Sequence, residues 1–575
     1  MKRFTARVDA RGVTTIAGPK PIASDGLEIL IRGYIANEED IAAPAAEDKT
    51  EGETRIAACF ARAYRRWGAE LSRHVYGEYA VAVYDPAKRT CLLAHDALGI
   101  VPLYYQQRGP EIVLGTHLDD VVQHRGALEL DEEYIADFLC HGDHFGERTP
   151  FSSIKQLRLE TSVSCGPEGV RKHACGVFGS IETTRYSDIR DYADHLRALV
   201  TSGVRAALPQ EGTVWCELSG GLDSSTVVCT AVGLRGAQNV KSISVVYPDS
   251  QANDESRWVD KVIEATGIES HRVNGDAAMP FSQLPDRFGD LPTHGYIHMA
   301  RFRAYEALVV KNQVGLILTG HGGDAVLYGD GPGPFFLADL LCGGNFRTLA
   351  QGLRNWTNES PKRRPARYWL SQFAVRGAMR RATGQVVACD LMPAPWIHGE
   401  YRAAARLNGK RRKSWFGRGA SVADACFLER LLRSANVVTT SENLAWLDVE
   451  YRCPLMYLPL VQFMRSIPWE MRTSPTWDRL LHREAMKGVL PDAVRLRRTK
   501  GGPTQAVFRG LASGAAWLRI LCGKTLLEER GYVDGARWNE AVEMAKIGNC
   551  RNIKQFMAAA TLEAWLRLYE SGRGK

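Results

Sequence analysis

The sequence predicts an α/β protein with two domains, over residues 1–175 and 185–575. Three observations predict it. Short apolar runs separated by turn residues dominate the first segment, which is typical of β structure. From Asp188 onward, apolar strands alternate with amphipathic helices, which indicates a parallel sheet with covered faces. Beyond Asp330 the pattern is mainly helical through Leu568.

The elements of the first segment follow from the spacing of its apolar residues. One helix with apolar positions at helical spacing is expected at Thr54–Trp67. Strands are expected at Leu27–Gly33, Glu78–Asp85, Thr90–His95 and Glu111–Gly115.

The second segment begins with a helical pattern and then alternates regularly. Its expected helices are Asp191–Ala207, a helix after the Gly-rich turn at 219–221, Glu255–Thr266 and Ala300–Lys311. Its expected strands are Thr213–Leu218, Lys241–Tyr247, Ser270–Val273 and Val314–Thr319.

The composition excludes several classes of protein. With 45% hydrophobic and 24% charged residues, the chain is neither disordered, nor a collagen, nor a coiled-coil rod. The net charge of +8 is compatible with an anionic ligand, but we expect no nucleic acid partner. Thirteen cysteines without a Cys-x-x-Cys pair argue against zinc, and the odd count without a signal peptide predicts a cytoplasmic location. No apolar stretch approaches the roughly 20 residues that span a bilayer.

The sharpest local feature is the loop Ser219–Ser225 (SGGLDSS), between an apolar strand and a helix. Two glycines let the backbone approach an oxyanion, and the helix N-terminus adds partial positive charge. The alternative is a glycine turn whose serines merely cap a helix. The strand–turn–helix setting favours a phosphate site, and the missing Gly-Lys-Ser/Thr ending excludes a Walker loop.

Together with three later motifs, this loop resembles the pyrophosphate-binding loop of the ATP pyrophosphatases, in the asparagine synthetase branch. The later motifs are Thr319–Asp324 (TGHGGD), Glu450–Pro454 (EYRCP) and Leu490–Gly501 (LPDAVRLRRTKG). The resemblance covers nearly the whole chain. It implies an adenine nucleotide α-hydrolase-like α/β synthetase domain with a helical C-terminal part. Members of the branch convert a carboxylate to an acyl-adenylate, release pyrophosphate and pass the acyl group to an amine.

The resemblance also implies ATP and Mg²⁺ as cofactors and assigns roles to residues. Asp223 and Asp324 are expected to hold Mg²⁺, which prefers one or two carboxylates with phosphate and water oxygens. Lys500 is expected to stabilise the charge of the tetrahedral intermediate, although basic runs are usually solvated. For Leu218 and Val245, ordinary strand core is the alternative to ATP contact. The full set expected at ATP is Leu218, Ser219, Gly220, Gly221, Asp223, Ser224, Ser225, Val245, Thr319 and Gly320.

The first segment resembles the glutamine-hydrolysing domain of the same synthetases, an Ntn-hydrolase-like α+β sandwich. His95–Tyr104 (HDALGIVPLY) follows the family's Arg-Asp-x-x-Gly-x-x-Pro-Leu-Tyr. That glutaminase needs an N-terminal cysteine as nucleophile and base, whereas this sequence begins with Met1 and its first cysteine is Cys59. Arg32–Asn37 (RGYIAN) also replaces the family's Asn-Gly-Glu-Ile-Tyr-Asn. We therefore expect a domain that keeps the fold and has lost the hydrolysis.

Without glutamine, the amine comes from free ammonia or from the substrate itself, as in the β-lactam synthetase and lasso peptide cyclase branches. His321 stands where asparagine synthetases usually carry Glu, and a histidine titrating near pH 6.5 suits a general base. Glu442 could orient it. The alternative is that His321 only bonds to the loop backbone.

The C-terminal third resembles the lasso peptide cyclases most, in Tyr451–Glu470 and Arg497–Gly510. We therefore expect a macrolactam synthetase that joins the N-terminal amine of a ribosomal peptide precursor to an Asp or Glu side chain. The resemblance implies a maturation protease or leader-binding protein as partner. The basic stretches Lys362–Arg381 and Lys410–Arg418 suit a peptide ligand, although surface helices are the simpler explanation. An ammonia-dependent asparagine synthetase, a β-lactam-synthetase-like ligase and an inactive peptide-presenting scaffold stay open as alternatives.

Overall fold

The structure is a computed structural model of the whole chain. It describes residues 3–9, 12–41, 52–109, 111–122, 128–142, 146–249, 254–289, 291–328, 333–361, 363–383, 393–411, 421–441, 449–498 and 504–573.

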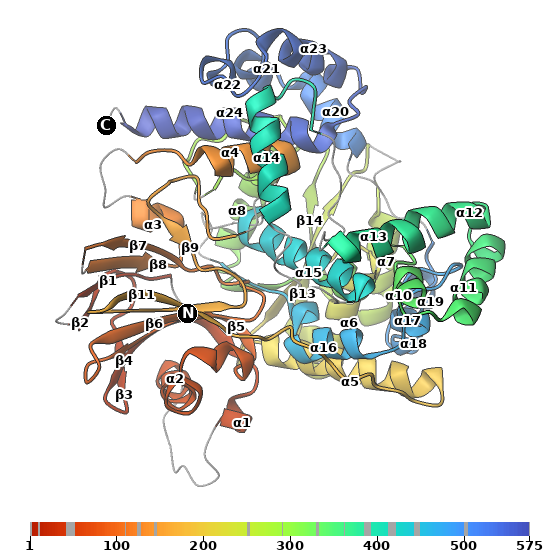
Figure 1. The fold of residues 1–575 in the computed structure, drawn as a ribbon, viewed down its shortest axis with the longest axis horizontal. Coiled ribbons are helices and arrows are strands. Elements are labelled where there is room, and N and C mark those ends of the chain that lie inside the picture. Colours follow the sequence, from red (N-terminus) through yellow and green to blue (C-terminus); the bar gives the residue numbers. More distant parts are fainter. Residues whose placement is uncertain are drawn as a thin grey trace.

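Two antiparallel sheets build the first part (Figure 1). One has the order β2-β1-β8-β7-β9, with β1 (Thr5–Asp9), β2 (Gly12–Ala17), β7 (Tyr104–Arg108), β8 (Glu111–Gly115) and β9 (Lys155–Gln156). The other has the order β11-β10-β6-β5-β4-β3, with β3 (Ile22–Ser24), β4 (Leu27–Ile35), β5 (Gly77–Asp85), β6 (Thr90–His95), β10 (Thr161–Gly166) and β11 (Gly169–Ala174). The helices of this part are α1 (Glu38–Ile41), α2 (Glu53–Trp67), α3 (Leu118–Val122) and α4 (Glu132–His141).

The two sheets stack as a sandwich, because their facing side chains share one core. Phe4 and Leu114 of the first sheet lie in the same buried cluster as Leu30 and Leu93 of the second. Helix α2 covers the outer face of the second sheet through residues such as Phe60. The four strands and the helix expected in this segment are confirmed, whereas β1, β2, β3, β7, β9, β10 and β11 were not foreseen.

A parallel sheet with the order β14-β13-β12-β15-β16 forms the centre of the second part. Its strands are β12 (Val214–Glu217), β13 (Val240–Val246), β14 (Glu269–Asn274), β15 (Leu316–Leu318) and β16 (Glu450–Arg452), and the helices nearest it in sequence are α5 (Ile189–Ala207), α6 (Leu222–Arg235), α7 (Ser256–Thr266) and α8 (Met299–Lys311). Helices α5, α6 and α7 share a core with one face of the sheet, and α8 packs on the other. The alternation predicted a covered parallel sheet, which is confirmed.

The rest of the chain is mainly helical, as expected. Its helices are α9 (Gly323–Val326), α10 (Phe336–Cys342), α11 (Phe346–Glu359), α12 (Ala366–Trp369), α13 (Arg376–Thr383), α14 (Gly399–Arg411), α15 (Val422–Ser441), α16 (Leu458–Ser466), α17 (Trp469–Arg472), α18 (Leu480–Ala485), α19 (Asp492–Arg495), α20 (Thr504–Ser513), α21 (Ala515–Leu521), α22 (Leu526–Glu529), α23 (Gly535–Lys546) and α24 (Ile553–Arg573). Of the basic stretches, Lys362 and 412–418 lie outside the described residues, and Ala366–Trp369 and Arg376–Thr383 are helical.

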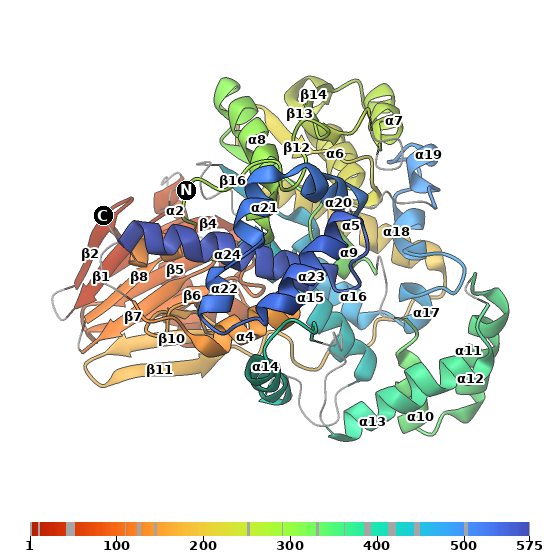
Figure 2. The ribbon, with the colours of Figure 1, turned by 90° about the horizontal axis from the view of Figure 1, so that it is seen from above.

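The last helices lie across both parts of the molecule (Figure 2). Trp565 of α24 and Trp538 of α23 share a buried cluster with Phe138 of α4 and Tyr104 of β7. The segment between the two parts is also fixed, because the guanidinium of Arg465 donates to the carbonyl of Gly179 at 3.0 Å. Within the described ranges, none of the helices combines the length and apolar composition that a membrane crossing requires.

Candidate active site

The loop Ser219–Ser225 connects β12 to α6 and is held by its own hydroxyl groups. The Ser224 hydroxyl lies 3.0 Å from that of Ser219 and accepts a hydrogen bond from the Ser219 backbone N–H at 3.2 Å. Gly220 has φ +70°, and a Cβ there would lie 2.6 Å from Cβ of Trp258. The first turn of the 14-residue helix α6 follows directly, so its free N–H groups and its dipole face the loop.

The loop Thr319–Asp324 follows β15 and packs against the first loop through glycines. A Cβ on Gly320 would lie 2.5 Å from the Ser224 backbone nitrogen, and one on Gly323 would lie 2.5 Å from Cγ of Asp223. Glycine is therefore required at both positions for the loops to approach this closely.

Asp223 and Asp324 converge on a single cation. The two terminal nitrogens of Arg479 pair with the two carboxylates, one with each. Arg479 precedes helix α18 in the left-handed region, at φ 54°, and is 7% exposed. Two carboxylates from separate loops thus share one positive charge, so the residues fit a cation at this point.

The donor set at this point is suited to Mg²⁺. Among the residues that the structure describes, no three His, Cys, Asp or Glu side chains gather as a metal site. A hard cation held by Asp223 and Asp324 would therefore complete its coordination with phosphate and water oxygens, which is the preference of Mg²⁺.

Two further side chains, those of His482 and Arg497, contact the loop Ser219–Ser225 and the helix α6 that follows it. The imidazole of His482 is 1% exposed, and its Nε2 lies 2.9 Å from the Thr226 hydroxyl in α6. Burial, together with the charges of Arg479 and Arg483, lowers the pKa of His482 well below its usual range. Arg497 donates to the Gly220 carbonyl at 3.1 Å and stacks over the Trp258 ring.

A cavity of about 320 Å³ opens between the two loops and the segment 478–498. Of the sequence-predicted residues, eight line it: Ser219, Gly221, Asp223, Ser224, Thr319, Gly320, His321 and Asp324. The backbone N–H of His321 donates to the Thr319 hydroxyl at 3.3 Å. The structure therefore brings His321 to the same cavity as the two aspartates.

The other sequence-predicted residues are not in this lining. Leu218 belongs to the core shared with α5 and α6, Ser225 is fully buried, and Val245 packs on the α8 side of the sheet. Gly220 contacts the cavity wall only through its carbonyl bond to Arg497. Lys500 and Glu442 lie outside the described residues.

Ten further residues line the cavity outside the sequence-predicted set, among them Glu217, Arg479, Arg483 and Arg497. Glu217 accepts a hydrogen bond from the Thr319 hydroxyl at 2.8 Å. Side chains alternate along a strand, so Glu217 points away from the core that holds Leu218. In the sequence, Glu217 could have been identified as a site residue because it is a charged residue at the end of an otherwise apolar strand.

Arg32 and Tyr34 stand where the glutaminases that the first part resembles have Asn and Glu, and both contact neighbouring side chains. Arg32 donates to Nδ1 of His117 at 3.2 Å, and burial lowers the pKa of His117 well below its usual range, so this imidazole is neutral. The Tyr34 hydroxyl donates to Glu78 at 3.3 Å. Asp96 accepts hydrogen bonds from the backbone N–H groups of Tyr79, Leu98, Ile100 and Val101.

Comparison with known families finds two matches along the chain. The asparagine synthase profile matches residues 195–567, and the glutamine amidotransferase domain profile matches residues 13–174.

Curated relatives span most of both parts. The chain is 22% identical over 533 residues to asparagine synthetase [glutamine-hydrolyzing] 3 of Bacillus subtilis, covering 88% of this chain and 80% of the relative. It is 21% identical over 492 residues to asparagine synthetase [glutamine-hydrolyzing] 1 of the same organism, covering 82% and 74%. It is also 22% identical to the amidase chry2 of Gibberella zeae, covering 52% and 46%.

Proposed function

Because the chain belongs to the asparagine synthase family and is an ATP-dependent carbon–nitrogen ligase, we propose that it closes a macrolactam in a ribosomal peptide. In this reaction an Asp or Glu side chain of a lasso-type precursor is adenylated and pyrophosphate leaves. The N-terminal amine of the peptide then attacks the acyl carbon, loses a proton to the general base and displaces AMP. The observation that carries the ligase chemistry is the convergence of Asp223 and Asp324 beside the loop Ser219–Ser225.

Different residues of this site would bind the phosphates, hold the metal ion and stabilise the intermediate. The Ser219 and Ser224 hydroxyls and the N-terminus of α6 offer donors to phosphate oxygens. Bound Mg²⁺ would neutralise charge on the triphosphate and on the leaving pyrophosphate. Asp223 and Asp324 would hold that ion, and the guanidinium of Arg479 would then pair with a phosphate oxygen in place of the two carboxylates. We keep Lys500 as the residue that stabilises the tetrahedral intermediate.

The first part supports an amine source other than glutamine. In the resemblance to glutaminases, Arg32 and Tyr34 stand at an Asn and a Glu that serve glutamine hydrolysis. Here Arg32 is bound to His117, and Tyr34 is bound to Glu78 and covered by Arg452. These side chains have taken structural partners, which supports an amine source other than glutamine, and in the macrolactam proposal that amine is the N-terminus of the peptide itself. We keep His321 as its general base and Glu442 as the residue that orients His321.

A second function, asparagine synthesis with ammonia, is favoured by the relatives named asparagine synthetase, whose names specify glutamine hydrolysis as the source of the amine. An assay of the full-length protein distinguishes the two functions. The protein is incubated with ATP and magnesium chloride and with each of three probes in turn. The probes are aspartate with ammonium chloride, aspartate with glutamine, and a short peptide with a free N-terminal amine and an internal Asp or Glu. AMP and pyrophosphate are measured by phosphorus NMR, and the products by mass spectrometry.

Loss of one water from the peptide, with AMP and pyrophosphate formed, supports the macrolactam proposal. Asparagine from either aspartate mixture, with an unchanged peptide, overturns it. No ATP turnover with any probe would favour the inactive scaffold. Asp223→Asn should lower turnover by about 10²-fold to 10³-fold, as does the loss of a preorganised charge contact elsewhere. Asp492→Asn is the matched control, because the exposed carboxylate of Asp492 pairs with Arg495 at 2.8 Å and is not part of the cavity lining.

A further inference from the structure

The two parts of the molecule meet at a buried hydrogen bond. The backbone N–H of Cys453 donates to Oε1 of Glu78 at 2.8 Å. Glu78 lies on β5, opposite Tyr34 of β4, and is 5% exposed. The same oxygen accepts the Tyr34 hydroxyl at 3.3 Å. A carboxyl group of the first part therefore fixes the backbone of the Glu450–Pro454 segment in the second.

Arg452, the residue before this bond, reinforces the contact. Its guanidinium lies 4.3 Å from the centre of the Tyr34 ring, pairs with Glu450 at 2.7 Å and donates to the Ala207 carbonyl at 2.9 Å. Its own carbonyl accepts the backbone N–H of Thr319 at 3.0 Å. Thr319 is the first residue of the loop that ends at Asp324. The bond between Glu78 and Cys453 is therefore connected to the cavity through Arg452 and Thr319.

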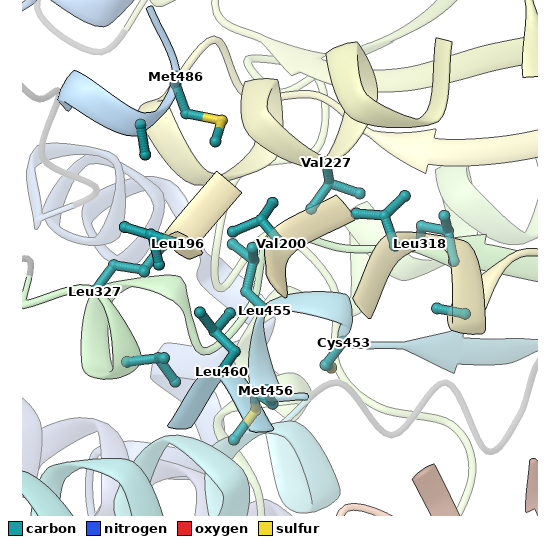
Figure 3. Packing of buried hydrophobic residues seen from close by; sticks show 14 of the residues in the cluster. Leu196, Val200, Val227, Leu318, Leu327, Cys453, Leu455, Met456, Leu460 and Met486 are labelled. Carbon is teal, nitrogen blue, oxygen red and sulfur yellow. The ribbon is translucent and has the colours of Figure 1, made fainter. Parts of the chain in front are cut away.

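The other end of the segment touches the same loop. Gly322, at φ 81°, lies against Met456, and a Cβ on Gly322 would lie 2.2 Å from Cγ of that side chain. Leu455 is fully buried beside Val200 of α5 (Figure 3), in the same cluster as Leu318 of β15. The segment 452–456 is thus packed tightly and bounds the loop Thr319–Asp324 at two points.

From this chain of contacts we propose that Glu78 is a positioning residue for the ligase reaction. By accepting the hydrogen bond of Cys453, Glu78 fixes the position of the segment 452–456. Because this segment contacts Thr319 and Gly322, it in turn fixes the position of His321 and Asp324 in the cavity. The first part thereby keeps a role in the reaction that needs no hydrolysis of glutamine. This inference rests on the proposed ATP-dependent ligation.

Two substitutions of Glu78 separate positioning from charge. Glu78→Gln keeps an acceptor oxygen for Cys453 and should keep turnover within about twofold. Glu78→Leu removes the acceptor and leaves the Cys453 N–H buried without it. Because a shift of about 1 Å in catalytic geometry costs about 10²-fold in rate, we expect kcat to fall at least tenfold. The KM for ATP should rise as well, since Asp324 and the glycines that pack on Ser224 and Asp223 belong to the displaced loop.

A matched control separates positioning from loss of stability. Glu28 of β4 accepts the backbone N–H of Val13 at 3.1 Å, which is the same kind of bond within the first part alone. Glu28→Leu should lower the thermal midpoint and leave kcat unchanged well below that midpoint. If Glu78→Leu does not fold, Arg452→Lys is expected to lower kcat in its place, because the ammonium cannot stack flat on Tyr34.

The outcomes are distinct for the two proposals. A wild-type protein that turns over no ATP with any probe contradicts the proposed function. An active wild type whose Glu78→Leu variant keeps its kcat, or whose Glu28→Leu variant loses as much, contradicts the positioning role alone. A tenfold loss confined to Glu78→Leu, with recovery in Glu78→Gln, supports it.

Discussion

The hydroxyl of Thr226 lies 2.9 Å from Nε2 of His482, where α18 meets the first turns of α6. The other ring nitrogen, Nδ1, lies 3.9 Å from Asp223. The Thr226 hydroxyl donates its one proton to the Leu222 carbonyl at 2.8 Å, so Nε2 of the neutral imidazole carries the ring proton and donates it to the Thr226 oxygen. This neutral imidazole links the helix that carries Arg479 to the helix that carries Asp223.

We expect the pair to be energetically coupled. His482→Leu and Thr226→Val each remove one partner of a buried hydrogen bond and should lower the free energy of unfolding by about 1–3 kcal/mol. The double variant should cost less than the sum of the two, by about 1 kcal/mol, because the bond is lost only once. Denaturant unfolding of the four proteins measures this difference. Additive effects would mean that the two side chains do not interact.

Arg479 should reduce the amount by which magnesium chloride raises the thermal midpoint of the ligand-free protein. Its guanidinium already neutralises Asp223 and Asp324, so a metal ion must compete with it. In Arg479→Met the two carboxylates are left without this partner, and their mutual repulsion favours a cation. Magnesium chloride should therefore raise the thermal midpoint more in Arg479→Met than in the wild type.

The control for this effect removes one carboxylate as well. The double variant Arg479→Met, Asp324→Asn should lose the magnesium response, because a single carboxylate remains. Equal shifts in the wild type and in Arg479→Met would show that the guanidinium does not occupy the position of the ion.

The strand–turn–helix connection at Ser219–Ser225 was predictable because its determinants are local. A strand, two glycines and a helix start follow one another within Thr213–Ser225, and the second loop is equally compact. Arg479 was not, because it reaches Asp223 across 256 residues and depends on a left-handed backbone that no spacing signals. Strand β16 was missed as a strand for a related reason. Its three residues include the charged Glu450 and Arg452, and the parallel pairing with β15 is what makes them a strand.

The glycine at position 323 should be essential for activity. A Cβ there would lie 2.5 Å from Cγ of Asp223, so Gly323→Ala must displace that carboxylate. We expect ATP turnover to fall at least tenfold, in line with the cost of a displacement of about 1 Å. Steady-state release of pyrophosphate measures it.

Gly233 offers the matched control. It lies in α6, and a Cβ there meets nothing within 4 Å. Gly233→Ala should leave turnover unchanged and stabilise the protein by about 0.5–1 kcal/mol, because alanine loses less backbone entropy in a helix. Normal turnover in Gly323→Ala would contradict the close approach of the two loops.

The buried carboxyl group of Glu78 should make stability depend on pH. Burial raises the pKa of Glu78 to about 8 from its usual 4.5, and the nearby carboxylate of Asp96 adds to this shift. The groups that face it are Tyr34 of β4, Asp96, and Glu450, Arg452 and Cys453 of the second part.

The sign follows from proton binding. Between pH 4.5 and about 8 the folded protein holds a proton on Glu78 that the unfolded chain releases. The free energy of unfolding therefore decreases as pH rises, and the contribution of Glu78, complete below pH 4.5, is lost as pH rises through about 8. Glu78→Gln cannot ionise and keeps its contribution, although Asp96 titrates in both proteins. Thermal midpoints from about pH 6 to about pH 9 should thus fall less steeply for Glu78→Gln than for the wild type. Parallel curves would mean that Glu78 is already ionised in the folded protein, held by Arg452.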